Sequence, residues 1–297
     1  MNVLNEIILI AQFQEIFKNK VMKNHIMPCI WFNNNALEAL DYYTEVIPNT
    51  SVKKNNGITV EAKIADLDFI AINADSTFKT NPSISFMLVF ESKEEVQSVW
   101  NKFKVNGNIL MPLDKYPFSD YYGWIVDHFG ISWQVYLGKL DDVNKQKVIP
   151  TLMFCEKQQG KCKPALEFYA KLFKEFELQG TLEYSSEKEM KNQIMHSQCV
   201  INNLTIAAMD SGVPQDFTFN EAISFSISCK DQDEIDYYWD KITEFGEESR
   251  CGWSKDPFGV SWQIVPYEMD KIMTENSKAS TALFKMKKII IADLINA

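Results

Sequence analysis

One phrase occurs twice in the sequence and indicates how the chain is organised. The stretch "DHFGISWQVYL" spans residues 127–137, and "DPFGVSWQIVP" spans residues 256–266. Both contain Asp-x-Phe-Gly-x-Ser-Trp-Gln, so the two stretches agree at most of their first eight positions. A shared phrase of this length predicts an internal duplication.

Further matches occur in the same order along the chain. "MPCIWF" matches "IPTLMF", "ALDYY" matches "ALEFY", "DFIAINAD" matches "LTIAAMD", and "NPSISF" matches "NEAISF". These matches predict two domains, at residues 27–140 and 149–268, joined by a polar linker at 141–148. We expect residues 1–26 to form a helical N-terminal extension. We expect residues 269–297 to form an amphipathic helical tail on the second domain, with a stripe of Leu283, Met286, Ile290 and Leu294.

Hydrophobic spacing within each copy alternates between strand and helix patterns. "TVEAKIADL" alternates as a half-buried strand does, and "SISFMLVF" reads as a second strand that leads into a helix. Three pairs of residues predict helix starts, each pair with an acidic residue three positions after a capping residue. They are Asn35 with Glu38, Ser92 with Glu95, and Asp231 with Glu234. The pattern predicts an α+β fold made of four βαβββ units.

The composition excludes several classes of protein. The formal net charge is −10, which argues against nucleic-acid binding because such proteins need a basic surface. Hydrophobic residues make up 46% of the chain, so disorder is excluded as well. The six cysteines form no C-x-x-C pair and read as free buried thiols. Because the N-terminus has neither a basic leader nor an unbroken apolar span, we expect a cytoplasmic protein without membrane contact.

The residues resemble a known family. The proline-containing first strand, the helices "NALEALDYYTEV" and "PALEFYAKLF", and Gly-Trp before an Asp-Pro-Phe-Gly turn are similar to the PhnB-like branch of the vicinal oxygen chelate superfamily. This superfamily includes glyoxalase and bleomycin-resistance proteins, and the branch is often labelled 3-demethylubiquinone 3-methyltransferase-like. The resemblance implies tandem domains, each with two paired βαβββ units that form a cup-shaped sheet. It also implies an intramolecular pseudo-dimer, and it leaves a further homodimer open.

The resemblance implies metal-ligand positions on the first and last strands of each unit. The first-strand positions fall at Pro28 and Pro150, which have no donor atom, and at Ser85 and Ser224, whose hydroxyls are poor ligands. One last-strand position is apolar in each copy, and the other falls at Gln134 and Gln263. A neutral amide without imidazole or carboxylate partners does not hold a transition metal well. We therefore expect no catalytic metal and no cofactor, with a divalent metal as the alternative.

Several residues are candidates for a binding or catalytic site. Gln134 and Gln263 either bind a small polar ligand or hydrogen-bond across the cup floor. Trp124 and Trp253 either stack on a flat ligand at the rim or pack. Trp133 and Trp262 point to the opposite face and are expected in the core. Glu61 and His196, which we take as equivalent in the repeat, are acid–base candidates.

These observations favour a protein that binds a small organic molecule in its cups without a metal. A first alternative is a metal-dependent or acid–base enzyme of lyase, isomerase or dioxygenase type. A second is a structural or interaction protein whose cups are filled by its own side chains. No G-x-G-x-x-G follows a strand, so the residues give no support to a Rossmann-type methyltransferase. Whether the protein is an enzyme stays open at this point.

Overall fold

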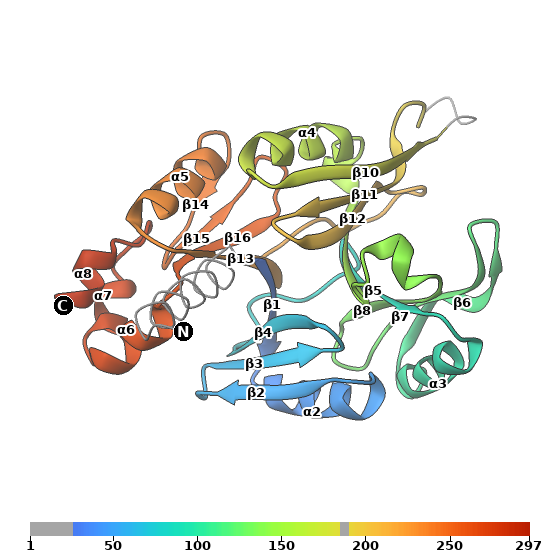
Figure 1. The fold of residues 1–297 in the computed structure, drawn as a ribbon, viewed down its shortest axis with the longest axis horizontal. Coiled ribbons are helices and arrows are strands. Elements are labelled where there is room, and N and C mark those ends of the chain that lie inside the picture. Colours follow the sequence, from blue (N-terminus) through green and yellow to red (C-terminus); the bar gives the residue numbers. More distant parts are fainter. Residues whose placement is uncertain (1–25, 185–189) are drawn as a thin grey trace, which may run out of the picture.

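The computed structural model describes residues 26–184 and 190–297. The N-terminal extension, expected to be helical over residues 1–26, lies outside the described residues except for Ile26. The described chain contains the expected four βαβββ units, which are followed by a helical tail (Figure 1).

The units follow one another along the chain. Unit one contains β1 (Ile26–Asn33), α2 (Ala36–Val46), β2 (Ser51–Asn55), β3 (Thr59–Ile64) and β4 (Leu67–Ala74). Unit two contains β5 (Ile84–Phe90), α3 (Lys93–Phe103), β6 (Asn108–Tyr116), β7 (Ser119–Val126) and β8 (Ser132–Leu137). The linker forms the 3₁₀ helix η1 (Leu140–Val143). Unit three contains β9 (Val148–Phe154), η2 (Glu156–Gln158), α4 (Cys162–Leu172), β10 (Phe176–Glu183), β11 (Ile194–Ile201) and β12 (Leu204–Asp210). Unit four contains β13 (Ile223–Cys229), α5 (Gln232–Thr243), β14 (Glu247–Glu248), β15 (Trp253–Lys255) and β16 (Ser261–Pro266).

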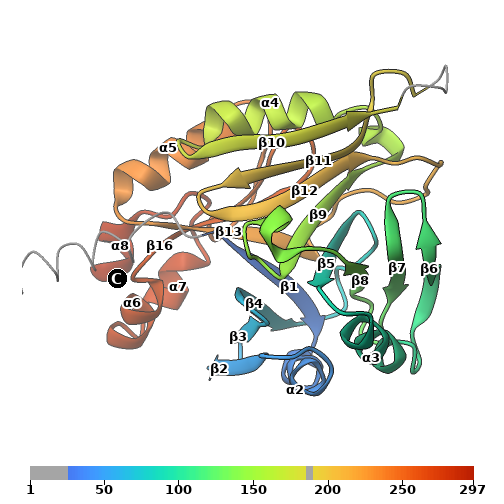
Figure 2. The same cartoon turned by 45° about the vertical axis from the view of Figure 1, so that its right-hand side comes forward.

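The units pair into two 8-stranded sheets. Sheet A has the order β14-β15-β16-β13-β1-β4-β3-β2, and sheet B has the order β10-β11-β12-β9-β5-β8-β7-β6. Units one and four therefore build sheet A, and units two and three build sheet B (Figures 1 and 2). Paired units are present as predicted, but each sheet takes one unit from each half of the chain and not both units of one predicted domain. The two halves thus join as a pseudo-dimer within one chain.

Antiparallel pairing of first strands joins the two halves. In sheet A, β1 pairs with β13 and aligns Pro28 with Phe225. In sheet B, β5 pairs with β9 and aligns Phe86 with Pro150. These four residues lie on the face of each sheet that is turned to the helices and the core. We call the opposite face of each sheet its cup face.

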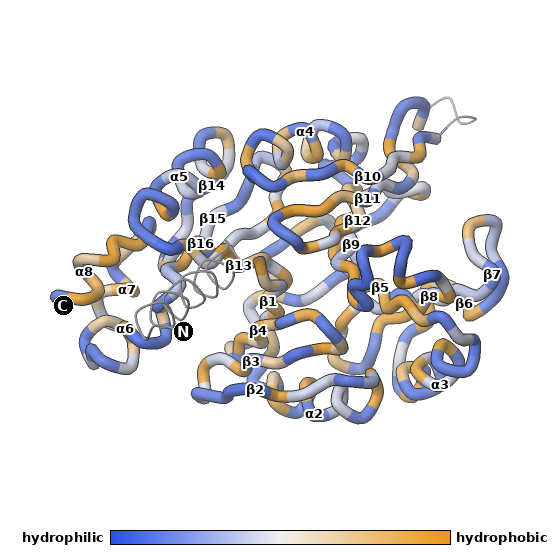
Figure 3. The backbone as a smooth tube through the Cα atoms, in the orientation of Figure 1, coloured by the Kyte–Doolittle hydropathy of each residue, from blue (hydrophilic) through white to orange (hydrophobic). Residues whose placement is uncertain are grey.

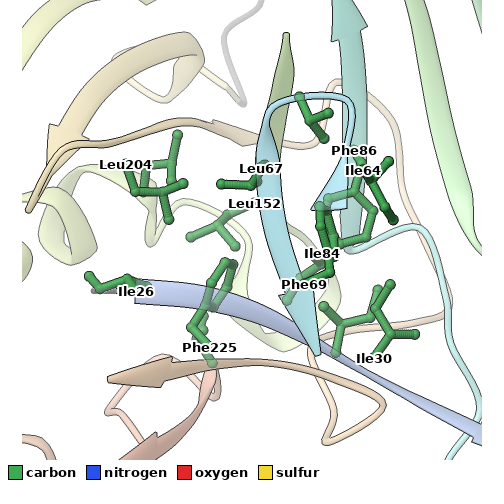
Figure 4. Packing of buried hydrophobic residues seen from close by; sticks show 14 of the residues in the cluster. Ile26, Ile30, Ile64, Leu67, Phe69, Ile84, Phe86, Leu152, Leu204 and Phe225 are labelled. Atoms are coloured by element: carbon green, nitrogen blue, oxygen red, sulfur yellow. The ribbon is translucent and has the colours of Figure 1, made fainter. Parts of the chain in front are cut away.

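The core combines residues from all four units. Figure 3 shows hydrophobic segments gathered in central strands such as β5, β8 and β12, with hydrophilic segments at the outer turns. Figure 4 shows side chains from distant strands pointing toward one another, among them Phe69 and Phe86, whose ring centroids lie 5.0 Å apart. Strand β3 shows how one face of a sheet is turned to the core. Val60, Ala62 and Ile64 are buried, while the residues between them are half-buried.

Two of the three predicted helix caps are confirmed. The Ser92 hydroxyl accepts a hydrogen bond from the Glu95 amide at 3.2 Å, and Asp231 does the same for Glu234 at 3.0 Å. Helix α2 begins directly after Asn35, as predicted, but the Asn35 side chain makes no cap hydrogen bond, so its predicted capping role is wrong. The neighbouring strand supplies the cap instead: Asn73 of β4 accepts from the first amide of α2 at 3.2 Å.

The tail is not one continuous helix, which corrects the sequence-based expectation. It forms α6 (Met269–Glu275), α7 (Ala279–Leu283) and α8 (Ile291–Ile295), with an irregular segment between α7 and α8. The carbonyls of Met286 and Lys287 accept hydrogen bonds from the amides of Cys251 and Gly252, at 2.9 and 2.8 Å. Because those carbonyls bind unit four, they are not available for a continuous helical ladder.

Within the part of the chain that is described, no helix is long and apolar enough to cross a membrane.

Candidate functional site

The aspartate of the repeated phrase organises the turn and the core beside it. Oδ1 of Asp256 accepts hydrogen bonds from the amides of Phe258 and Val260, at 2.9 and 3.1 Å. Oδ2 of Asp256 accepts from the Tyr169 hydroxyl at 2.7 Å and from Nε1 of Trp262 at 3.0 Å. Burial raises the pKa of Asp256 to about 6, although these donors oppose the rise.

Unit two repeats this arrangement. Asp127 accepts hydrogen bonds from the Tyr43 hydroxyl at 2.7 Å and from Nε1 of Trp133 at 2.8 Å, and burial raises its pKa as well. Gly130 and Gly259 complete the two turns with φ of 86° and 90°, a region that favours glycine. Trp133 and Trp262 are buried in the core, as predicted. Asp, Gly and Trp of the phrase are therefore structural.

The glutamine of the phrase lies on the cup face, one residue after the core tryptophan. Nε2 of Gln134 donates to Ser85 Oγ at 2.8 Å, and Nε2 of Gln263 donates to Ser224 Oγ at 2.9 Å. The structure thus brings the four predicted residues together as two Gln–Ser pairs, one on each sheet. Gln134 and Ser85 belong to sheet B, whereas Gln263 and Ser224 belong to sheet A.

The two glutamines differ in their second hydrogen bond. Oε1 of Gln134 accepts from the Tyr122 hydroxyl at 2.8 Å, and the side chain is buried. Oε1 of Gln263 accepts no hydrogen bond from the residues described, and the side chain is half-buried. The amide of Gln134 is therefore satisfied on both sides, while the carbonyl oxygen of Gln263 has no donor within residues 26–184 and 190–297.

A substitution between the repeats accounts for this difference. Trp124 pairs with Gln134 and Trp253 pairs with Gln263, so the two tryptophans are equivalent. Two positions before each tryptophan stands Tyr122 in one copy and Cys251 in the other. Cys251 has φ of 57° and precedes strand β15. No tyrosine hydroxyl therefore stands in the place that would serve Gln263. Comparison of the two copies in the sequence would have revealed this exchange.

The alignment of first-strand ligand positions with Pro28 and Pro150 is wrong by one residue. Both prolines pair with core phenylalanines, so they face away from the cups. The cup positions of these strands are Cys29, which pairs with Ser224, and Thr151, which pairs with Ser85.

The corrected positions do not fit a catalytic divalent metal. In sheet A they are Cys29, Ile70, Ser224 and Gln263, and in sheet B they are Thr151, Ala207, Ser85 and Gln134. Burial raises the pKa of the Cys29 thiol to about 12, which opposes the thiolate form that metals bind. The other donors are hydroxyls and amides, and the expectation of an apolar last-strand position is confirmed at Ile70 and Ala207. Among the described residues, no group of three or more His, Cys, Asp or Glu side chains could hold a metal ion.

Glu61 and His196 both lie on cup faces, but they are not at equivalent positions. Glu61 pairs with Ile70 of sheet A, and the matching pair in sheet B is Gln198 with Ala207. His196 stands two residues before Gln198 on the same strand face, so the predicted equivalence is wrong. Desolvation by surrounding protein atoms lowers the pKa of His196, although the side chain is largely exposed on strand β11, next to the edge strand β10.

Glu61 belongs to a small charged cluster at the edge of sheet A. Partial burial and then the nearby carboxylate of Asp270 raise the pKa of Glu61, while Lys54 and Lys53 oppose the rise. Nζ of Lys54 lies 2.5 Å from Oδ2 of Asp270. The cluster connects strands β2 and β3 to the tail helix α6.

Aromatic side chains gather at the other end of the sheet A cup face. The ring centroids of Trp31 and Trp253 lie 6.3 Å apart in an edge-to-face arrangement, and those of Trp31 and Phe78 lie 5.1 Å apart. Nε1 of Trp31 donates to the Asp75 carbonyl at 2.7 Å. Trp31 was missed in the sequence, although the alternation of "MPCIWF" places it on the same face as Cys29. In sheet B, Trp124 donates instead to Ser132 at 2.7 Å.

The linker covers part of the sheet B cup face. Val143 of η1 is buried in a small apolar cluster with Val89, Ile149 and Ala207, and Leu140 packs against it. Nε2 of Gln198 donates to the carbonyl of Asp142 at 2.8 Å, which fastens the linker to the same face. The two cup faces therefore differ in what lies on them.

Comparison with known proteins shows the family of this chain. The family model of 3-demethylubiquinone-9 3-methyltransferase matches residues 24–136 and again residues 146–265. The chain belongs to this family. Members of the 3-demethylubiquinone-9 3-methyltransferase family share the fold of the vicinal oxygen chelate superfamily, which confirms the predicted resemblance.

Two solved structures are similar to parts of this chain. A PhnB protein from Bacillus cereus, described as a putative 3-demethylubiquinone-9 3-methyltransferase, is 28% identical over 38% of this chain and 98% of its own, with a TM-score of 0.35. Glyoxalase I from Zea mays is 11% identical, covers 84% of this chain and 96% of its own, and has a TM-score of 0.54. The second likeness shows the fold alone. A search of curated proteins found no match.

Proposed function

We propose that this family member binds a small organic molecule on the cup face of sheet A and does so without a divalent metal. The observation that supports the proposal most directly is the difference between the two glutamines. Gln263 keeps a carbonyl oxygen without a donor among the described residues, whereas Gln134 is satisfied by Tyr122 and Ser85. A partly buried acceptor of this kind suits a ligand that supplies a hydrogen bond.

The surroundings of Gln263 support the same site. Trp31 and Trp253 offer aromatic surface, and Ser224 and Ser226 line the strand beside Gln263. On sheet B, the linker already packs against Val89, Ile149 and Ala207, which favours a cup that is filled by the protein's own side chains. The proposal therefore assigns ligand binding to sheet A and packing to sheet B.

A thermal-shift screen of a small-molecule library tests this function. Hits with the wild-type protein are measured again with Gln263→Ala and with Gln134→Ala as the matched control. We expect Gln263→Ala to weaken the stabilisation by the hits, while Gln134→Ala lowers the melting temperature of the free protein but keeps the ligand-induced shift. Shifts that are lost in Gln134→Ala and kept in Gln263→Ala would contradict the assignment to sheet A.

The same assay tests the absence of a metal. Zn²⁺, Ni²⁺, Mn²⁺ and Fe²⁺ are added singly to protein dialysed against a chelator. We expect no stabilisation that depends on Gln263, because the cup positions of sheet A supply a protonated thiol, a hydroxyl and an amide. A stoichiometric metal whose binding is lost in Gln263→Ala would favour the metal-dependent enzyme instead.

An acid–base enzyme is the second candidate, and Glu61 supports it. The raised pKa of Glu61 and its place on the cup face of sheet A suit a general acid or base. If ligands found in the screen are converted to products, we expect Glu61→Gln to abolish turnover while ligand binding persists. Turnover that is unchanged in Glu61→Gln would remove this candidate.

A further inference from the structure

The tail helix α6 is the counterpart on sheet A of the linker helix η1 on sheet B. Two residues separate β8 from η1, and two residues separate β16 from α6. Each helix therefore follows the strand of the repeated phrase at the same distance along the chain. The aligned residues are Leu140 with Met269 and Val143 with Ile272, and all four are apolar. The duplication thus places one short helix after the last strand of each half.

Both helices reach the same part of their sheets. On sheet B, Nε2 of Gln198 on β11 donates to the Asp142 carbonyl at 2.8 Å. On sheet A, the equivalent residue Glu61 on β3 hydrogen-bonds Asp270 of α6, and Oδ2 of Asp270 accepts from Nζ of Lys54 on β2 at 2.5 Å. Four strands lie between β16 and β2 in the sheet, so the chain passes over the cup face to make these contacts (Figures 1 and 2).

The linker is fastened firmly to sheet B. Asn144 and Gln179 of β10 exchange two side-chain hydrogen bonds, at 2.8 and 3.1 Å. Gln146 and Thr205 of β12 exchange two more, at 2.8 and 2.9 Å. The chain then continues into β9, so strands of sheet B hold the linker at both ends. The cover of this cup is therefore a fixed part of the fold.

Helix α6 is held to the far strands of sheet A by weaker contacts. The Lys54–Asp270 pair is exposed, with 47% and 54% of the two side chains accessible, and exposed ion pairs add little stability. Partial burial and then the charge of Asp270 raise the pKa of Glu61, so an ionised Glu61 opposes this contact. Met269 and Met273 are partly buried against the core, and methionine side chains adapt readily to new neighbours.

We propose that α6 is a movable lid over the sheet A cup. The Lys54–Asp270 ion pair holds it closed, and it opens when a ligand enters or leaves. The linker is the fixed form of the same cover on sheet B. This inference rests on the proposed function, because it concerns access to the site beside Gln263.

Hydrogen exchange of the full chain, followed by mass spectrometry, tests the lid. We expect the amides of residues 269–276 to exchange at least ~10-fold faster than those of residues 140–147, because a loosely held element opens locally. Lys54→Ala breaks the ion pair and leaves the sequence of α6 intact. We expect it to speed exchange in residues 269–276 about 2- to 5-fold, as is typical for an exposed ion pair. Lys115→Ala breaks another exposed pair, with Asp120, and is the matched control that leaves both segments unchanged.

The strongest ligand from the library screen tests the connection to binding. We expect saturating ligand to slow exchange in residues 269–276 and to leave residues 140–147 unchanged. A lid that opens more often admits ligand more often, so Lys54→Ala should speed ligand association about 2- to 5-fold in stopped-flow measurements. Lys115→Ala should keep the association rate of the wild type.

The outcomes separate the two proposals. Equal exchange in the two segments, or exchange and association rates that Lys54→Ala does not change, overturns the lid and leaves the proposed function in place. If no library compound binds either the wild type or Lys54→Ala, the proposed function is contradicted. The lid is then contradicted as a gate as well, even where residues 269–276 exchange rapidly.

Discussion

The aspartate and tryptophan of the repeated Asp-x-Phe-Gly-x-Ser-Trp-Gln phrase serve the core side of the sheet, and its glutamine serves the cup face. Asp256 and Trp262 bind each other and Tyr169 on the core face, while Gln263 reaches the cup face. The alternation of a strand explains why neighbours in the sequence have unrelated roles. Retention of the phrase in both copies therefore reflects mainly packing, and only the glutamine bears on ligand binding.

The buried carboxylate of Asp256 predicts a pH dependence of stability. Its folded pKa of about 6 lies above the value for an unfolded chain, so its contribution is most favourable at low pH and is lost as pH rises through about 6. We expect the unfolding free energy of the wild type, relative to Asp256→Asn, to fall by about 2–3 kcal/mol between pH 4 and pH 7. Urea unfolding of both proteins at the two pH values measures this. Parallel pH profiles of unfolding free energy for the two proteins would show that folding does not raise the pKa of Asp256.

Tyr122 predicts a stability effect that depends on Gln134. Removal of its hydroxyl in Tyr122→Phe leaves Oε1 of the buried Gln134 without its donor, and we expect a loss of about 1–2 kcal/mol in unfolding free energy. Tyr116→Phe is the matched control, because the Tyr116 hydroxyl donates to the Pro112 carbonyl in an exposed hydrogen bond. Urea unfolding compares the two variants. Equal losses of unfolding free energy would mean that the buried Tyr122–Gln134 hydrogen bond stabilises the protein no more than the exposed hydrogen bond of Tyr116.

At the scale of elements, alternation and helical spacing were sufficient to predict the strands, the helices and two caps. The same patterns do not specify which strands become neighbours in a sheet, because β1 offers the same alternation to any partner strand. The pairing of unit one with unit four was therefore beyond the sequence argument. The tail was predicted wrongly for a related reason, since its apolar spacing says nothing of the carbonyls that Cys251 and Gly252 bind.

The candidate site was predictable where the repeated phrase or the resemblance marked a position. Gln134 and Gln263 stand out in the repeated phrase, and the metal-ligand positions implied by the resemblance fall at Ser85 and Ser224 as well. Tyr122 was missed because the residue at its place in the second copy is Cys251. Trp31 was missed because the residue at its place in the matching stretch "IPTLMF" is Met153, so the repeat does not mark this position. The proline positions were wrong because a shift of one residue along a strand changes the face.

The linker element gives a direct prediction about sheet B. Val143→Asp places a carboxylate among Val89, Ile149 and Ala207, and we expect a loss of about 3 kcal/mol in unfolding free energy. The control Lys139→Asp introduces the same side chain at an exposed position just before η1, outside this cluster, and is expected to cost under about 1 kcal/mol. Chemical denaturation of both variants measures the difference. A tolerated Val143→Asp would mean that the linker does not close the sheet B cup.

At the scale of the whole molecule, duplication has produced two cups with different contents. Sheet B holds the linker and a glutamine fixed by Tyr122. Sheet A holds a glutamine whose Oε1 has no donor in the described part of the chain, beside a pair of tryptophans. The fused pseudo-dimer is thus unequal inside, although its two sheets have matching strand orders. One chain should therefore bind one ligand molecule rather than two.

Calorimetric titration of the chelator-dialysed full chain with the strongest ligand from the screen tests this claim most directly. The account predicts a stoichiometry of one ligand per chain, with affinity reduced in Gln263→Ala and unchanged in Gln134→Ala. A stoichiometry of two, or binding that appears only after a divalent metal is restored, would contradict it.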